Sequence, residues 1–208
     1  MSEKTPPKSR LKQVRILLWV LVILAAAGMA AMWSFHRAPV DAPQTIATKT
    51  SFGGPFTLVG ADGKPFPSSR LAGKPYAIYF GFTRCGDVCP TTLSRLVKLR
   101  RAAATDDALN IVFVTIDPKN DGPKEVGQYA QLFGAPIIGL TGSPAQIDGV
   151  KKHYGIYAQP VPHAAMGQSI MHTATVLLFD RTGKFSGTIS ADEPDSAAVA
   201  TLKQLTDL

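Results

Sequence analysis

Hydrophobic residues first gather in one long run near the start of the chain. Residues 16–33, ILLWVLVILAAAGMAAMW, contain no charged side chain. A helix of this length is about 27 Å long, close to the roughly 30 Å hydrocarbon thickness of a bilayer. Residues 1–15 carry five cations and one acid, a bias that keeps an N-terminus in the cytoplasm. The pattern predicts a cytoplasmic basic tail over 1–15 and a transmembrane anchor over 16–33.

A cleaved signal peptide is the alternative, because the small residues over 25–31 would suit a signal peptidase. The apolar run is longer than the roughly 7–15 residues of a signal-peptide core, which favours an uncleaved anchor. In either case the rest of the chain is exported to a compartment that permits disulfides. Residues 34–50 are rich in Pro, Ala and Thr and show no regular period, so they form a flexible tether before one domain, 51–208.

Within this domain, short apolar runs alternate with amphipathic stretches. Residues 74–82 and 110–117 are apolar almost throughout, as in strands buried on both faces. The pattern predicts a short strand at 136–140, two strands within 171–190 joined at 180–183, and a hairpin at 56–66. It also predicts helices at 90–104, 123–133, 143–155 and 194–205, and an irregular loop at 157–169. Strands alternating with helices indicate a layered α/β domain. The element order is that of thioredoxin-like folds.

The distribution of charge along the chain argues against one class of function, nucleic-acid binding. The formal net charge is +7, of which residues 1–15 supply +4. The domain itself is only weakly basic and has no basic stripe interleaved with aromatic residues, so we expect no nucleic-acid partner.

The two cysteines of the chain, Cys85 and Cys89, lie in GFTRCGDVCP, between a predicted strand and a predicted helix. A helix N-terminus exposes unpaired N–H groups and a partial positive charge, which lowers the pKa of a thiol placed there. Three residues separate the cysteines, one more than in most dithiol oxidoreductases. Such a pair can close a disulfide or bind one soft ion such as Cu(I) or zinc. A purely structural disulfide would close too short a loop to stabilise the fold much.

Two thiolates alone make a poor metal site, and the candidates for a third ligand are His36, His153, His163 and His172. We expect His36 in the tether and His153 on a helix surface, both away from the cysteines. His163 and Met166 fall in the predicted loop, where they could contact an incoming metal. His172 immediately precedes the strand that should lie against the dithiol in a thioredoxin-like sheet. A histidine there could be structural, but two thiolates nearby favour a metal ligand.

Other polar residues near these blocks have two interpretations each. Asp87 is either a helix cap or an oxygen donor to a bound metal ion, and Asp117 either caps a turn or supports the site from outside. Met171 adjoins His172 but should point to the opposite face of an extended strand, so we assign it to packing. The predicted helix 90–104 carries a basic set that is either solvated or docks an acidic partner: Arg95, Lys98, Arg100 and Arg101.

Three blocks of the chain resemble the SCO/SenC family of membrane-anchored copper proteins: YFGFTRCGDVCPTTL (79–93), VTIDPKNDGPKEVGQYA (114–130) and MHTATVLLFDRTGKF (171–185). The resemblance extends over about residues 51–206. It implies a thioredoxin-like fold with insertions, and copper, as Cu(I) and in a second state as Cu(II), bound by Cys85, Cys89 and His172. Arg84 and Gly86 depart from the family's frequent histidine and proline, at positions that are not ligands.

The resemblance also implies a copper chaperone rather than an enzyme, one that delivers copper to, or prepares, the CuA site of cytochrome c oxidase. The implied partners are the copper-containing oxidase subunit and a periplasmic copper donor or thiol reductase. The implied location is the inner membrane, with a single span and the domain in the periplasm. The alternative is a thiol–disulfide oxidoreductase whose redox-active dithiol, Cys85 and Cys89, reduces an exported protein. A peroxiredoxin-like peroxidase fits less well, because Thr83 lies two residues before Cys85 rather than three.

Overall fold

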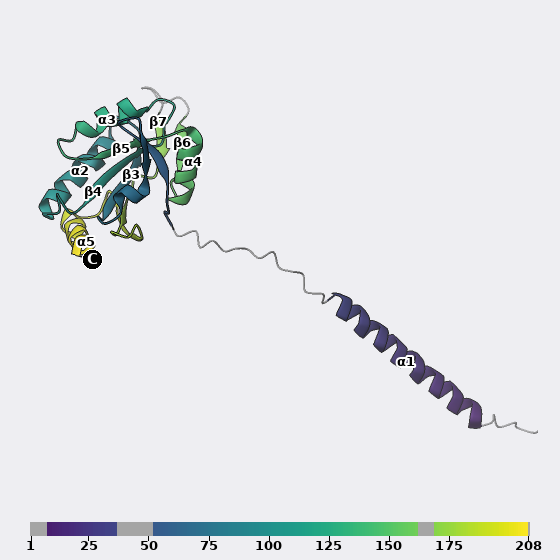
Figure 1. The fold of residues 1–208 in the computed structure, drawn as a ribbon. Coiled ribbons are helices and arrows are strands. Elements are labelled where there is room, and N and C mark those ends of the chain that lie inside the picture. The colour runs from purple at the N-terminus through teal and green to yellow at the C-terminus, as the bar shows by residue number, and fades with distance from the viewer. Residues whose placement is uncertain (1–7, 37–51, 162–168, 208) are drawn as a thin grey trace, which may run out of the picture. The chain divides into compact units, whose positions relative to one another are not determined.

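The computed structural model describes residues 8–36, 52–161 and 169–207. The chain divides into two units, Met1–Thr48 and Lys49–Leu208. The first contains one helix, α1, and the second contains all the strands and the remaining helices of the described chain (Figure 1). Residues 37–50 of the predicted tether and the loop residues His163 and Met166 lie outside the described residues.

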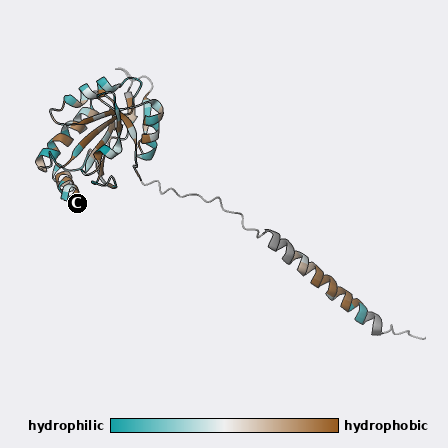
Figure 2. Cartoon of the chain, in the orientation of Figure 1, coloured by the Kyte–Doolittle hydropathy of each residue, from teal (hydrophilic) through white to brown (hydrophobic). Residues whose placement is uncertain are grey.

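Helix α1 extends over Lys8–His36. Its segment Lys12–Met29 is long and apolar enough to cross a membrane, and none of its side chains is buried within the protein. Figure 2 shows the apolar colouring running along the middle of this helix. A helix that exposes apolar side chains on all sides is stable in lipid rather than in water. The helix is therefore a candidate membrane anchor.

The domain is built on a seven-stranded sheet with the order β2-β1-β5-β4-β3-β8-β9. The three central strands β3, β4 and β5 are parallel, and every other pairing is antiparallel. Both β3 and β4 are buried almost throughout, as their continuous apolar runs predict. The strands are β1 Thr57–Gly60, β2 Pro65–Pro67, β3 Tyr76–Gly81, β4 Asn110–Thr115, β5 Ile138–Thr141, β8 Val176–Phe179 and β9 Phe185–Ile189.

Helices cover both faces of this sheet: α2 Val88–Ala102, α3 Pro123–Gln131, α4 Pro144–His153 and α5 Asp195–Asp207. Right-handed crossovers between successive parallel strands place α2 and α3 on the same face. Tyr129 of α3 accordingly packs on Phe113 of β4, with ring centroids 5.0 Å apart. Helix α5 packs beside α2, while α4 lies on the opposite face, where Tyr154 contacts Phe80 (Figure 1).

Successive side chains of β3 point to opposite faces of the sheet. Phe80 points to the α4 face, and its neighbours Tyr79 and Gly81 point to the α2 face. A Cβ added to Gly81 would lie 2.9 Å from Sγ of Cys89 and 3.1 Å from the Tyr79 ring. The glycine thus allows the start of α2 to pack directly on the sheet.

A separate two-stranded antiparallel sheet, β6 Ala158–Val161 with β7 Ser169–His172, lies outside the main sheet. The prediction of an irregular loop at 157–169 is therefore wrong for the β6 residues. Alternation of apolar and polar residues is weak in this short segment, and pairing with β7, rather than a local pattern, makes it a strand. The same pairing means that His172 ends β7 and does not begin the β8 strand.

Candidate metal centre

The fold brings together three side chains from two distant parts of the chain. Cys85 lies in the loop after β3, Cys89 in the first turn of α2, and His172 at the end of β7. The two Sγ atoms and a ring nitrogen of His172 all lie within 4.8 Å of one another. Among the described residues this is the group of His, Cys, Asp and Glu side chains that could hold a metal ion. Their convergence is the geometry that the sequence predicts.

Cys89 is the buried member of the set, with no solvent-exposed surface. Burial raises the pKa of its thiol to about 12, because an anion is poorly stabilised away from water. The expectation of a lowered pKa at this helix start is therefore wrong for Cys89. The backbone of Phe82 and the side chain of Tyr79 lower the pKa of this thiol, but desolvation outweighs them. Without metal, Cys89 is a neutral thiol.

Cys85 is the more accessible member. Its backbone N–H donates a hydrogen bond to the carbonyl of Phe82, at 3.2 Å, which closes a tight turn after β3. Its Sγ accepts the backbone N–H of Cys89, at 3.4 Å. Both cysteines are free thiols in the structure. The α2 cap residue Asp87 makes no side-chain capping hydrogen bond, which leaves this N–H for the sulfur.

His172 presents a defined ring nitrogen to the cysteines. Its Nδ1 lies 2.9 Å from the carbonyl of Thr173. A carbonyl only accepts, so Nδ1 carries the proton and Nε2 has a free lone pair. Nε2 lies 3.4 Å from Sγ of Cys89. Burial lowers the pKa of the imidazole, against the smaller opposite effect of the Thr173 carbonyl, and so favours the neutral ring that binds metal.

Two aromatic rings hold this imidazole edge-on. The centroid of the His172 ring lies 6.1 Å from that of Tyr79 and 5.9 Å from that of Phe82, both in T-shaped contact. Since Tyr79 and Phe82 belong to β3 and the turn that follows it, the main sheet supports the histidine although β7 is not part of that sheet.

Two sulfurs and one neutral imidazole form a soft, three-ligand set. Thiolates select Cu(I), zinc and iron–sulfur clusters. A set of three ligands suits Cu(I) better than zinc, because zinc prefers four ligands in a tetrahedral arrangement. Because Cys85 is partly exposed, an incoming ligand can reach the ion from that side. The arrangement can therefore bind a soft ion and release it.

A buried carboxylate that the sequence did not single out anchors the loop before Cys85. Asp121 is fully buried and accepts hydrogen bonds from the backbone N–H of Thr83, at 2.9 Å, and from the hydroxyls of Thr83 and Thr115, each at 2.6 Å. Its own carbonyl accepts the Thr141 hydroxyl, at 2.6 Å. A single acid thus ties the dithiol loop to β4 and β5. An acid in a polar segment carries no sequence signal of this burial.

Asp117 supports the same loop from outside. Its carboxylate pairs with the Arg84 guanidinium, at 2.7 Å, and accepts two hydrogen bonds from the Asn120 amide. Arg84 directly precedes Cys85, so the outer role that we considered for Asp117 fits its contacts.

The other candidates lie away from the centre or outside the described chain. His153 is exposed at the end of α4, as expected. Met171 is 56% exposed, so its assignment to packing is wrong. The side chain of His36 is not among those described, and the predictions for His163 and Met166 stay untested.

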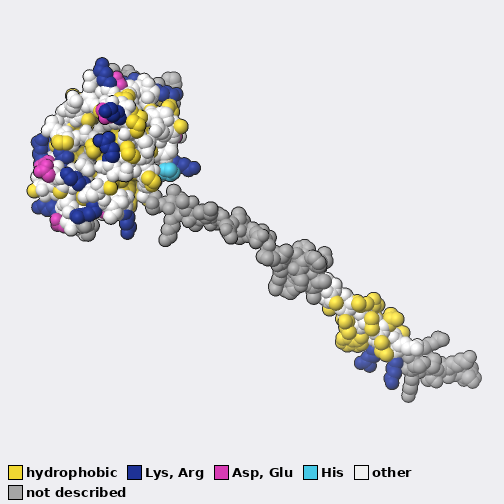
Figure 3. Space-filling view, viewed as in Figure 1, with side chains coloured by type: hydrophobic (Ala, Val, Ile, Leu, Met, Phe, Trp, Pro, Cys, Tyr) yellow, Lys and Arg dark blue, Asp and Glu magenta, His cyan; other side chains and the backbone are white. Residues whose placement is uncertain are grey.

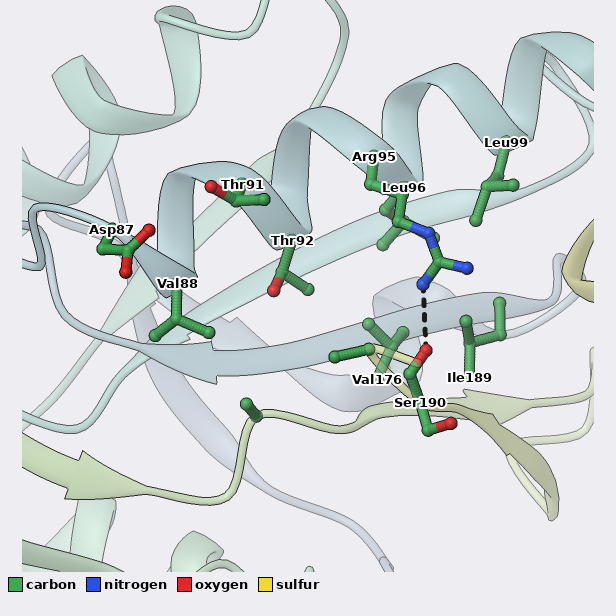
Figure 4. A pocket seen from close by; sticks show the side chains of 12 residues that line it. Asp87, Val88, Thr91, Thr92, Arg95, Leu96, Leu99, Val176, Ile189 and Ser190 are labelled. Carbon is green, nitrogen blue, oxygen red and sulfur yellow. Dashed lines mark hydrogen bonds between the residues drawn. The ribbon is translucent and has the colours of Figure 1, made fainter. Parts of the chain in front are cut away.

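The basic set on α2 is mostly used within the domain. Arg100 is buried and donates to the carbonyl of Pro136, and Arg101 donates to that of Gly134. Arg95 pairs with Asp195 and donates to the carbonyl of Ser190, across a cavity of about 180 Å³ between α2 and β8–β9 (Figure 4). Lys98 remains exposed. Because Arg95, Arg100 and Arg101 donate hydrogen bonds within the domain, a basic docking surface on α2 is not supported. On the face seen in Figure 3, Lys and Arg side chains are spread among other residue types.

Comparison with known proteins agrees with this geometry. The SCO1/SenC family model matches residues 44–207. The chain belongs to the SCO1/SenC family. The SCO2-like protein of Rickettsia prowazekii is 30% identical over 182 residues, covering 86% of this chain and 89% of that protein. The longer mitochondrial SCO1 homolog 1 of Arabidopsis thaliana is 38% identical over 113 residues, 53% of this chain and 34% of that protein.

A solved family structure extends the match to three dimensions. The copper-bound ScoI of Bradyrhizobium japonicum superposes with a TM-score of 0.67 and 37% identity, covering 74% of this chain and 99% of that chain. The prediction of a thioredoxin-like α/β fold is confirmed.

Proposed function

We propose that this protein is a membrane-anchored copper chaperone that holds one Cu(I) through Cys85, Cys89 and His172 and delivers it to the CuA site of cytochrome c oxidase. The convergence of their ligand atoms within 4.8 Å carries the proposal. Family relatives with bound copper support the choice of metal, and the family resemblance supports the oxidase as acceptor.

The state of each ligand suits uptake of a soft cation. His172 is already a neutral imidazole whose free lone pair, on Nε2, faces Cys89. The thiols bind as thiolates, so each loses its proton to solvent as its bond to copper forms. Two thiolates, one imidazole and one Cu(I) leave a complex with one negative charge.

Delivery requires that the acceptor's ligands replace these three in turn. Cys85 and His172 are partly exposed, whereas Cys89 is buried. We therefore expect soft ligands of the oxidase subunit to displace His172 or Cys85 first and Cys89 last. Exchange in steps never releases a free ion into water.

The proposed location follows from the N-terminal segment. Helix α1 is the candidate anchor, and the cations of the tail 1–15 favour a cytoplasmic N-terminus. A single span then puts the domain in the periplasm, where an oxidase subunit or a copper donor can reach it. The tail 1–15, anchor 16–33, tether 34–50 and domain 51–208 remain proposed boundaries.

A second function, reduction of an oxidase subunit's disulfide, is favoured by the proximity of the two free thiols. The thiolate of the partly exposed Cys85 would attack a partner disulfide and release one partner thiolate. Cys89 would then attack Cys85, releasing the second partner thiolate and leaving a Cys85–Cys89 disulfide. His172 is not required for this chemistry.

One experiment separates the two. Full-length protein in detergent, reduced and kept anaerobic, is titrated with Cu(I) against a chromophoric competitor, and His172→Ala is measured beside it. The copper proposal predicts tight one-to-one binding that weakens in His172→Ala. No tight binding by the wild type, together with rapid reduction of a disulfide substrate by both proteins, would favour the reductase.

A further inference from the structure

The hydroxyl of Tyr79 lies buried beside the candidate copper site without a hydrogen-bond partner of its own. Tyr79 belongs to β3, points to the α2 face, and has no solvent-exposed surface. Within the described chain its oxygen makes no hydrogen bond of standard geometry. A buried hydroxyl without a partner costs about 1–3 kcal/mol, so one next to a reactive group needs an explanation.

The position of Gly81 shows how closely Tyr79 approaches the sulfur. A Cβ added to Gly81 would meet both Sγ of Cys89, at 2.9 Å, and the edge of the Tyr79 ring, at 3.1 Å. The Tyr79 hydroxyl lies near the side chains of Cys89 and Thr92 but has no hydrogen-bonding geometry to either. The Tyr79 ring is also in T-shaped contact with His172, with ring centroids 6.1 Å apart, so the tyrosine lies beside two of the three proposed ligands.

The charge on the sulfur of Cys89 determines whether this sulfur is a good hydrogen-bond acceptor for the Tyr79 hydroxyl. A neutral thiol is a weak acceptor, whereas a thiolate is a strong one. When copper binds, Cys89 changes from a neutral thiol to a thiolate, and its buried position keeps water from solvating that thiolate. The Tyr79 side chain and the backbone of Phe82 lie beside this sulfur, and each carries a group that can donate a hydrogen bond to it. The backbone donor is fixed by the fold, and the hydroxyl can rotate toward the sulfur.

We propose that Tyr79 is a positioning residue of the copper site, whose hydroxyl donates a hydrogen bond to Sγ of Cys89 in the copper-bound protein and thereby stabilises the bound state. The inference rests on the proposed ligand set, Cys85, Cys89 and His172. It assigns to Tyr79 a contact that forms on loading, so the cost of leaving the hydroxyl unpaired falls on the metal-free protein.

The chain offers a matched control in Tyr129 of α3. Its hydroxyl is also buried without a partner in the described chain, and its ring also packs on the α2 face, against Phe113. Among the described residues no hydrogen bond joins the Tyr129 hydroxyl to a copper ligand, although it is near enough to both cysteines to sense their charge. Tyr129→Phe therefore removes a buried hydroxyl without removing a hydrogen-bond donor to the sulfur. In both variants the phenyl ring keeps the packing.

The test compares full-length wild type, Tyr79→Phe and Tyr129→Phe in detergent. Competition titration gives the Cu(I) affinity, and denaturant unfolding of the metal-free proteins gives their stability. Hydrogen bonds to charged groups are worth about 1.5–3 kcal/mol, and sulfur is a weaker acceptor than oxygen, so we expect Tyr79→Phe to lower the affinity about 5- to 10-fold. Tyr129→Phe should leave it unchanged. Neither variant should destabilise the metal-free protein.

A spectroscopic readout distinguishes a contact to the sulfur from a packing effect. Loss of a hydrogen bond raises the energy of the sulfur lone pairs, so the thiolate-to-Cu(II) charge-transfer band of Tyr79→Phe should shift to longer wavelength. The inference would be overturned if Tyr79→Phe and wild type had equal Cu(I) affinities and equal charge-transfer bands. It would also be overturned if a loss of stability of the metal-free variant accounted for its weaker binding. Neither result would contradict the proposed ligand set of Cys85, Cys89 and His172. Failure of the wild type to bind Cu(I) would overturn both.

Discussion

The candidate site joins two regions that differ in how deeply they are buried in the fold. Cys85 lies in the loop after β3, and Cys89 lies in the first turn of α2. Every residue of β3 is buried, and Asp121 ties the loop before Cys85 to two further strands. His172 lies on the β6–β7 hairpin, whose residues Gln159, Pro160 and Val161 are exposed. A cavity of about 270 Å³ lies between this hairpin, α4 and residues 116–119. The dithiol is fixed in place, and the histidine is carried on a peripheral element.

This difference suits a protein that must both hold and release an ion. A rigid pair of sulfurs fixes where copper binds, and the reorganisation that binding requires is small. A ligand on a hairpin outside the main sheet can move away while the sheet stays intact, which gives the acceptor's ligands access to the ion. Four changes, in order of expected effect, test the contrast.

Removing a sulfur should have the largest effect. Cys89→Ser replaces a soft thiolate with a hydroxyl that does not ionise at neutral pH, so we expect tight Cu(I) binding to be lost. The loss should exceed the about 10- to 100-fold cost of removing an outer support of a metal site. Anaerobic competition titration measures it. Retention of affinity within tenfold of wild type would mean that Cys89 is not a ligand.

Removing the acid beneath the dithiol loop should affect the fold itself. Asp121→Ala deletes three hydrogen bonds to a buried carboxylate, and we expect a loss of about 3 kcal/mol or more in the free energy of unfolding. Denaturant unfolding of the metal-free protein measures this. The exposed Asp107→Ala is the control and should change stability by less than about 0.5 kcal/mol. Equal stabilities of the two variants would show that the carboxylate does not brace the rigid region.

Removing the imidazole should weaken copper binding but spare the fold. We expect His172→Ala to lower Cu(I) affinity about 10- to 100-fold, less than loss of a sulfur, because both thiolates remain. The stability of the metal-free protein should hardly change, since the hairpin lies outside the main sheet. His153→Ala, on the surface of α4, is the matched control. A large loss of stability would mean that the hairpin is part of the rigid region.

Acid should produce the smallest effect, part of it through His172 on the hairpin. The pKa of His172 is lowered in the folded protein, so its contribution to stability is present above the unfolded pKa of about 6.5 and is lost as pH falls through the folded value. Metal-free stability should therefore decline below pH 6.5 in wild type. His172→Gln should remove part of that slope, measured by unfolding at a series of pH values. An unchanged slope would show that the imidazole is as solvated as in the unfolded chain.

The sequence was most informative where one residue type carries the signal. Apolar runs predicted β3 and β4, the spacing of Cys85 and Cys89 placed one before α2 and one in its first turn, and the strand entrance led to His172. The sequence was less informative where contacts between distant parts of the chain determine a residue's structure or pKa. Burial of Cys89 reverses the pKa that its helix position suggests, β6 exists because β7 pairs with it, and nothing local marks Asp121 or Tyr79 as neighbours of the site.

X-ray absorption at the copper edge tests the central claim most directly. Full-length protein is loaded with one equivalent of Cu(I) under anaerobic conditions and compared with His172→Ala prepared in the same way. The account predicts two sulfur ligands and one imidazole nitrogen in wild type, with the imidazole signal lost in the variant. A wild-type spectrum with no imidazole, or one that His172→Ala leaves unchanged, would contradict it.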